Sequence, residues 1–141
     1  MTVASVMTGK PACCTPDSPL SEVARLMVEN DCGQIPVVQD LDSRKLAGVV
    51  TDRDIATRIV AKGLNSAEAR AADCMSTPGI SVTPETSLED CCTAMEHNKI
   101  RRVPVVDGAG SVVGIVSLAD VVQHARSATT AAVVKEVSSG N

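Results

Sequence analysis

The stretch GVVTDRD, which runs from Gly48 to Asp54, returns near the end of the chain as GIVSLAD, from Gly114 to Asp120. Each heptad contains a glycine, two β-branched residues, a hydroxyl residue, two variable positions and an aspartate. β-branched residues favour strands, and a Ser or Thr followed three residues later by an acid is typical of a helix start. We therefore expect each heptad to end a strand and to open a helix.

The two heptads close two copies of a longer repeat. The pair Thr15-Pro16 returns 68 positions later as Thr83-Pro84, and IPVV at 35–38 returns at the same spacing as VPVV at 103–106. A deletion of two residues in the second copy then brings the heptads into register. Repeats of this kind, here about 60 residues each, are supersecondary units too small to bury their apolar faces alone. We expect the two copies to pack against each other as a pseudo-two-fold pair.

Hydrophobic periodicity predicts the element order β-α-β-β-α in each copy, which is an α/β fold in the broad sense (α+β). The expected elements are the extended pieces ACCTP and ISVTP, helices within 18–31 and 86–99, strands at 35–39, 45–51, 103–107 and 111–117, and helices from Asp52 to about Ala61 and from Leu118 to about Arg126. Ser18 or Ser21 is expected to cap the first of these helices, and Thr86 or Ser87 its counterpart. The expected domains are repeat 1 at 1–62, a linker at 63–73, repeat 2 at 74–126 and a C-terminal tail at 127–141.

Three pairs of motifs occur twice in the same order at matching distances. They are MTGKPACCTP and MSTPGISVTP, QIPVVQD and RVPVVDG, and the two heptads. Together they resemble the CBS domain (cystathionine-β-synthase domain) family, over almost the whole chain from Val6 to Arg126. The resemblance is to stand-alone proteins with two repeats. It implies a disc-like module that often dimerises and that binds adenosine-containing ligands in two clefts between the repeats.

The resemblance implies a role for the heptad aspartates. Asp54 and Asp120 would accept hydrogen bonds from ribose hydroxyls, with Thr51 and Ser117 adding a hydroxyl contact. The alternative interpretation is structural, because a hydroxyl residue and an acid at this spacing also form a capping box at a helix start. Aliphatic residues of the heptads would wall the clefts, and backbone groups of the extended pieces would face the adenine. These residues are Val49, Val50, Ile115 and Val116 for the walls, and Ala12, Cys13, Ile80 and Ser81 for the adenine.

Phosphate binding needs positive charge, and the two copies differ in it. The resemblance places Arg101 and Arg102, just before a strand of repeat 2, as phosphate contacts, whereas repeat 1 has Gly33-Gln34 there. Arg53 lies inside the first heptad, and the second heptad has Ala119 in its place. The alternative for these arginines is a solvated surface or an ion pair with a nearby acid. The asymmetry indicates two unequal sites.

Composition excludes several classes of function. The net charge is −4 and no basic run exceeds Arg101-Arg102, which disfavours nucleic acid, and aromatic residues are absent, which removes the stacking platforms that single strands use. No apolar run is long enough for a membrane span, and the start lacks a signal-peptide pattern, so the expected location is cytoplasmic. Six cysteines without a CxxC pair indicate buried reduced thiols rather than a metal site. No catalytic constellation or metal cluster is evident, so we do not expect an enzyme.

The expected function is therefore a ligand-sensing regulatory module without a covalent cofactor. Its ligand would be an adenine nucleotide such as AMP, ADP or ATP, or alternatively S-adenosylmethionine or NAD. Its expected partners are a second copy, forming a homodimer, and a regulated protein that the sequence does not identify. A second possibility is an interaction protein whose heptads only cap helices. A third is an enzyme or a cysteine-based redox sensor, which has only Lys10 as a basic neighbour near Cys14.

Overall fold

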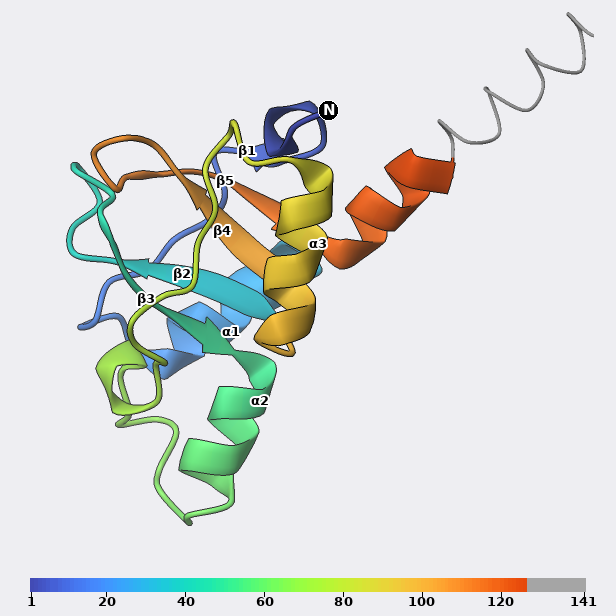
Figure 1. The fold of residues 1–141 in the computed structure, drawn as a ribbon. Helices are drawn as coiled ribbons and strands as arrows, with labels where there is room; N and C mark the ends of the chain where they lie inside the picture. Colours follow the sequence, from blue (N-terminus) through green and yellow to red (C-terminus); the bar gives the residue numbers. More distant parts are fainter. Residues whose placement is uncertain (127–141) are drawn as a thin grey trace, which may run out of the picture.

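A computed structural model describes residues 1–126 of the chain, so the expected tail at 127–141 lies outside the described residues. Both repeats contain the expected order of elements (Figure 1). Repeat 1 contains α1 (Leu20–Glu29), β2 (Gln34–Val38), β3 (Leu46–Thr51), α2 (Asp52–Ile55) and the π-helical turn η2 (Ala56–Val60). Repeat 2 contains α3 (Leu88–His97), β4 (Arg102–Val106), β5 (Val112–Ser117) and a helix at 118–126. The shorter elements are η1 (Val3–Ser5), β1 (Thr8–Gly9) and η3 (Ala71–Asp73).

Each repeat is built around an antiparallel pair of strands. β2 pairs with β3 in one sheet, and β4 pairs with β5 in the other, to which β1 adds a third strand. The expected extended pieces are present as single parallel bridges, Cys14 with Val37 and Val82 with Val105. The sequence-based fold class is therefore confirmed, as a mixed helix and strand structure made of two similar units.

The strands separate the side chains of each sheet onto two faces. Ile35, Val37 and Val50 are 1% exposed or less and point into the core of repeat 1. The equivalent residues Val103, Val105 and Val116 are fully buried in the core of repeat 2. Because successive side chains of a strand alternate between faces, the residues between them point away from these cores. That second face includes Gln34, Val49 and Thr51 in repeat 1, and Arg102, Ile115 and Ser117 in repeat 2.

The first segment of each repeat crosses to the other repeat. Val3 of η1 is buried in the core of repeat 2, and β1 pairs with β5 of that repeat. In return, Ala71 and Cys74 are buried in the core of repeat 1, and Ser76 exchanges two backbone hydrogen bonds with Val49 of β3. The cores thus cross the boundaries expected at 62 and 73, since residues of the expected linker help to bury repeat 1. Each repeat therefore has its own core and receives a segment from the other repeat.

The glycine that begins each heptad makes this crossing possible. A Cβ atom at Gly48 would lie 2.5 Å from the backbone oxygen of Ser76, and one at Gly114 would lie 2.7 Å from the Met7 sulfur and 3.1 Å from the Thr8 oxygen. All three distances are shorter than van der Waals contact. Glycine is therefore needed here for the close approach of another backbone rather than for an unusual torsion.

The helix starts agree only partly with the sequence-based expectation. Ser87 caps α3 by accepting a hydrogen bond from the backbone N–H of Asp90, which confirms one of the two candidates. The expectation for α1 was wrong: Pro19 is its N-cap residue, and Ser18 instead accepts from the backbone N–H of Thr15 in the preceding turn.

Within residues 1–126, no helix has the length and apolar character to cross a bilayer.

Candidate functional site

A cavity of about 690 Å³ lies between the two repeats, and we call it the large cavity. Its walls come from the first heptad, from the segment that opens repeat 2, and from the turn between α3 and β4. The lining residues are Gly33, Gln34, Val49, Thr51, Asp52, Arg53, Asp54, Ser76, Pro78, Ile80, Asn98, Lys99, Ile100, Arg101 and Arg102. Six of the residues predicted from the sequence for the clefts therefore lie on one cavity with Asp54: Val49, Thr51, Arg53, Ile80, Arg101 and Arg102.

The first heptad forms a complete capping box. The Asp54 backbone N–H donates to Thr51 Oγ1 at 3.0 Å, and the Thr51 backbone N–H donates to Asp54 Oδ2 at 3.0 Å. The structural interpretation of the heptad is thus confirmed for repeat 1. It leaves ligand binding possible, because a carboxylate has about four acceptor positions and the box uses one.

The Asp54 carboxylate has two further neighbours, and its side chain is only 13% exposed. The Ser76 hydroxyl lies 3.5 Å from both carboxylate oxygens, and the Arg58 guanidinium lies 3.8 Å from Oδ1. Arg58 also donates to the backbone oxygen of Met75 at 3.2 Å. The carboxylate is therefore held in place at the point where α2 meets the first segment of repeat 2.

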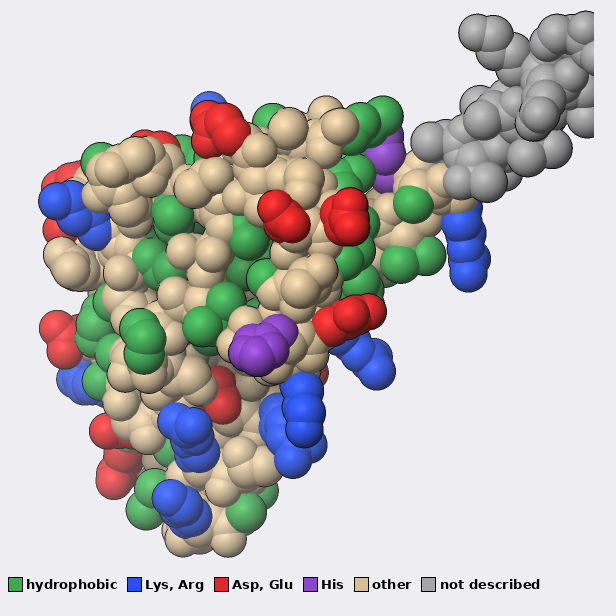
Figure 2. Space-filling view, in the orientation of Figure 1, with side chains coloured by type: hydrophobic (Ala, Val, Ile, Leu, Met, Phe, Trp, Pro, Cys, Tyr) green, Lys and Arg blue, Asp and Glu red, His purple; other side chains and the backbone are tan. Residues whose placement is uncertain are grey.

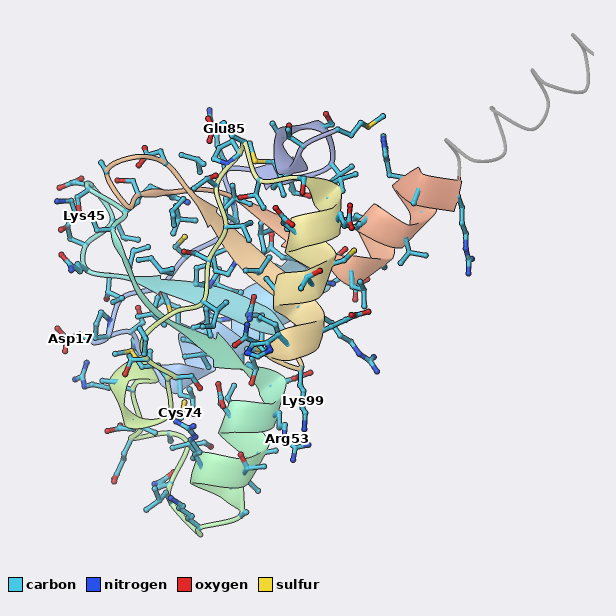
Figure 3. The ribbon with its side chains drawn as sticks, viewed as in Figure 1. Asp17, Lys45, Arg53, Cys74, Glu85 and Lys99 are labelled. Atoms are coloured by element: carbon cyan, nitrogen blue, oxygen red, sulfur yellow. The ribbon has the colours of Figure 1, made fainter. Side chains whose placement is uncertain are left out.

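The large cavity is basic. Arg53, Lys99, Arg101 and Arg102 line it, against the two carboxylates of Asp52 and Asp54. Figure 3 shows that Arg53 on α2 and Lys99 after α3 lie on the same side of the molecule, and Figure 2 shows Lys and Arg side chains gathered over this region. Repeat 2 thus brings three of its basic residues to the heptad of repeat 1. Such a surface attracts anions such as phosphate.

The corresponding region around the second heptad is different. A hollow of about 130 Å³, the small hollow, is lined by residues from both repeats that include Thr8, Ala12, Gln34, Arg102 and Ile115. Its lining includes neither Ser117 nor Asp120. Asp120 is exposed and instead lines a side hollow with Ser5, Val6, Gln123 and His124. The two sides of the molecule are therefore unequal in volume as well as in charge.

Several predicted cleft residues lie elsewhere. Val50 and Val116 do not line the clefts, because both are fully buried in the cores, and their neighbours Val49 and Ile115 line the large cavity and the small hollow. The prediction assigned consecutive strand residues to one wall, whereas consecutive residues alternate between faces.

The extended pieces also contribute only in part. Ile80 lines the large cavity and Ala12 the small hollow. Ser81 is exposed and is absent from the lining of either. Cys13 lies outside both linings too, and its sulfur accepts a hydrogen bond from Arg44 at 3.2 Å. Only one residue of each predicted pair, Ala12 of Ala12-Cys13 and Ile80 of Ile80-Ser81, therefore reaches the space between the repeats.

Five polar residues on the large cavity were not predicted from the sequence: Gln34, Asp52, Ser76, Asn98 and Lys99. The position of Gln34 could have been found from the repeat, because it aligns with Arg102. The position of Ser76 could not, because only the crossing of its segment over β3 brings it to the heptad. Lys99 is placed by a left-handed turn with φ 55°.

Three of the six cysteines behave as buried structural thiols. All six are free, and Cys14, Cys74 and Cys91 are buried. Burial raises the pKa of Cys14 to about 12, and burial is also the largest cause of the raised pKa of Cys74 and Cys91. A raised pKa keeps these thiols protonated and unreactive. Among residues 1–126 there is no group of three or more His, Cys, Asp or Glu side chains placed to hold a metal ion.

Comparison with known proteins agrees with this geometry. The model of the CBS domain matches residues 3–61 and again residues 71–127. The CBS domain-containing protein YhcV of Bacillus subtilis is 40% identical over 118 residues, which cover 84% of this chain and 81% of that protein. The solved structure of Hypoxic Response Protein I with two coordinated zinc ions has a TM-score of 0.79 and 33% identity, covering 88% of this chain and 98% of its own.

A second solved structure resembles the chain almost as closely. CBSX2 in complex with AMP has a TM-score of 0.76 and 28% identity, and the similarity covers 91% of this chain and 98% of that one. The two matches to the family model together span most of the sequence, one for each repeat. The chain therefore belongs to the CBS domain family, as a protein with two CBS repeats.

Proposed function

We propose that this CBS domain pair binds an adenine nucleotide, such as AMP, ADP or ATP, in the large cavity, and that it acts as a ligand-sensing regulatory module rather than an enzyme. The observation that carries the proposal is the meeting of three kinds of group on one cavity. These are the Thr51–Asp54 pair, the segment at 76–80 with its backbone groups, and the basic residues of repeat 2. They match the hydroxyls, the base and the phosphate of a nucleotide.

The ribose would lie against the Asp54 carboxylate, whose Oδ1 takes no part in the capping box. The base would lie along Pro78 and Ile80, which supply apolar contact where aromatic residues are absent. The phosphate would be bound by Arg53, Lys99, Arg101 and Arg102. CBSX2 has been solved with AMP, which supports this class of ligand for a protein of the same fold.

Charge separates this proposal from its alternatives. S-adenosylmethionine brings a sulfonium, which four basic side chains would repel, whereas phosphate would be attracted. An interaction protein with no ligand would bind neither compound.

We further propose that the chain forms a cytosolic homodimer through the helices of its repeats, since two-fold pairing is the commonest closed assembly. Light scattering at micromolar concentration should give about twice 14.6 kDa, and a monomer mass would contradict the dimer.

Titration calorimetry with adenosine, AMP, ATP and S-adenosylmethionine tests the proposal. We expect affinity to rise from adenosine to AMP and to be lowest for S-adenosylmethionine. The protein has no Trp or Tyr, so any co-purified nucleotide would also be visible near 260 nm. Tighter binding of S-adenosylmethionine than of AMP would contradict the phosphate assignment, and the absence of binding by all four compounds would contradict the function.

A further inference from the structure

The side chain of Gln34 has an unusual environment. It is only 5% exposed, and its carboxamide oxygen Oε1 is the one buried side-chain polar atom without a hydrogen-bond partner among residues 1–126. Buried polar groups in folded proteins are nearly always paired, because an unpaired one loses its hydrogen bonds to water without replacement. An orphaned acceptor beside a cavity is therefore a reason to look for a donor that comes from outside the chain.

Gln34 lies where the two repeats meet. It is the first residue of β2, and its register partner across the sheet is Thr51, the residue that caps α2. It lines both the large cavity and the small hollow, as does Arg102, its counterpart in repeat 2. Gln34 therefore shares the large cavity with the residues assigned to ribose, Thr51 and Asp54, and with a residue assigned to phosphate, Arg102.

The chemistry of an amide oxygen narrows the choice of donor. Oε1 accepts hydrogen bonds, and phosphate oxygens also accept, so the two do not pair. A nucleotide offers two kinds of donor, the ribose hydroxyls and the amino group of adenine. The base is assigned to Pro78 and Ile80, on the segment that crosses β3 beside Val49, two residues before Thr51. The hydroxyls are therefore the donors on the Gln34 side of the cavity.

The neighbours of Asp54 also favour a ribose hydroxyl as the donor to Gln34. Asp54 Oδ2 already accepts from the Thr51 backbone N–H, and Ser76 and Arg58 approach the carboxylate from other directions. The two ribose hydroxyls would therefore compete for the acceptor positions of the Asp54 carboxylate that are still free. We propose that Gln34 is a second specificity-determining residue of the large cavity, whose carboxamide oxygen accepts a hydrogen bond from one ribose hydroxyl while Asp54 accepts from the other. This inference rests on the proposed function and names how its ribose is recognised.

The proposal makes stability and binding respond in opposite directions. Gln34→Met keeps the length and approximate shape of the side chain and removes the orphaned oxygen. The variant should therefore unfold at a higher temperature than the wild type when no nucleotide is present. The same variant should bind AMP about ten-fold more weakly, because one hydrogen bond of the ribose is lost. The matched control is Gln39→Met, since Gln39 is exposed and lies outside both linings.

The decisive experiment is a titration of wild type, Gln34→Met and Gln39→Met with AMP, 2′-deoxy-AMP and 3′-deoxy-AMP. We expect one of the two deoxy compounds to bind wild type and Gln34→Met equally, because the hydroxyl that Gln34 reads is already missing. Gln39→Met should match the wild type with all three ligands.

Each contrary result has its own meaning. Equal losses with AMP and both deoxy compounds would overturn the proposal in favour of a change of cavity shape. No loss with AMP would overturn it in favour of a water molecule as the partner of Oε1. If Gln34→Met, titrated with adenosine as well, showed a smaller gain in affinity from adenosine to AMP than wild type, the amide would donate to phosphate, which also overturns the proposal. If wild type bound no AMP at all, the proposed function would fail as well, and this differs from AMP binding that does not depend on Gln34.

Discussion

The two heptads share a sequence pattern but finish in different surroundings. In the first, Thr51 and Asp54 exchange both hydrogen bonds of the capping box, and Asp54 is 13% exposed on a cavity of about 690 Å³. In the second, Ser117 accepts from the Asp120 N–H at 3.1 Å, and Asp120 is exposed on the side hollow. The shared pattern serves the fold, because both glycines admit a crossing segment and both hydroxyl residues start a helix. What the other repeat contributes decides which heptad faces a basic cavity.

The repeat positions explain that difference in charge. Lys99, Arg101 and Arg102 of repeat 2 align with Asp31, Gly33 and Gln34 of repeat 1. Because each heptad faces residues of the other repeat as well as its own, the basic set of repeat 2 serves the first heptad. One sequence pattern can therefore finish in two surroundings that differ in positive charge.

The largest expected effect concerns the two crossing glycines. Gly48→Ala should lower the free energy of unfolding by about 3 kcal/mol or more, because its Cβ would lie 2.5 Å from the Ser76 backbone oxygen. Gly114→Ala should cost about 1 kcal/mol, since its shortest contact is the flexible Met7 side chain. Urea unfolding of both variants measures the difference. Gly108→Ala, at a position with no atom within 4 Å of the new Cβ, is the control. Equal losses at Gly48 and Gly114 would show that the two crossings are equally tight.

The second prediction separates the two aspartates. Asp54→Ala should weaken AMP binding by roughly 10–150-fold, because a charged hydrogen-bond acceptor is lost from the cavity. Asp120→Ala should leave it nearly unchanged, because Asp120 lies on the side hollow. Calorimetry with AMP and with its 2′,3′-dideoxy analogue checks both, since the analogue should no longer distinguish wild type from Asp54→Ala.

Asp54 also caps α2, so its loss should lower stability by about 1 kcal/mol in addition. If Asp54→Ala melts at a lower temperature but binds AMP as wild type does, the capping box is its whole role. If Asp120→Ala weakens binding as strongly as Asp54→Ala, the two heptads are functionally equal and the comparison above is wrong.

A smaller effect is expected from the basic residues. Replacing both Arg101 and Arg102 with Gln should reduce AMP affinity about ten-fold and leave adenosine binding nearly unchanged. The wild-type preference for AMP should also weaken as salt is added, because partly exposed charges are screened. A variant with Arg25→Gln and Lys45→Gln removes the same charge from exposed positions outside the cavity and is the control. Equal losses in the two double variants would indicate general attraction by net charge.

Much of the fold was predictable because the sequence contains the same pattern of elements twice. Strand and helix periodicity located β2, β3, β4 and β5 to within a residue or two, and the repeat indicated that the units pack together. The crossing of η1 and β1 onto repeat 2 was not predictable, because it depends on a contact between distant segments. The change from α2 to the π-helical turn η2 at Ala56 also has no signal in the side-chain pattern.

The site residues that belong to a recognisable motif were predictable from the sequence. Thr51, Asp54 and the three arginines lie together on the large cavity, although their ligand-binding role stays a prediction. The prediction that both Val49 and Val50 wall the cleft failed for Val50, because the resemblance identifies the segment but not which face of the strand each residue occupies. Gln34 was missed because a polar residue in an apolar strand has no motif of its own, although the repeat aligns it with Arg102. In the folded chain its orphaned oxygen also marks it.

The smallest expected effect is on the pH dependence of the free energy of unfolding, to which a buried thiol in each core contributes. The pKa of Cys14 is about 12 in the folded chain, above the ordinary value of 9.0, because burial disfavours the thiolate. The folded state therefore holds this proton while the unfolded state releases it. The resulting stabilisation is complete below about pH 8 and is lost as pH rises from about 9 towards 12. Between pH 7.5 and 9.5, wild type should lose about 1 kcal/mol more unfolding free energy than Cys14→Ala.

The control for this effect is Cys91→Ala in the core of repeat 2. Burial raises the pKa of Cys91 in the same direction, so Cys91→Ala should also remove pH dependence, and comparing the two variants shows how much of the slope each core contributes. The readout is the difference between two pH values for each variant, so the constant cost of a cavity in either core cancels. Urea unfolding at both pH values measures it. Identical slopes for wild type and Cys14→Ala would mean that water reaches the core of repeat 1 readily enough to solvate its thiolate.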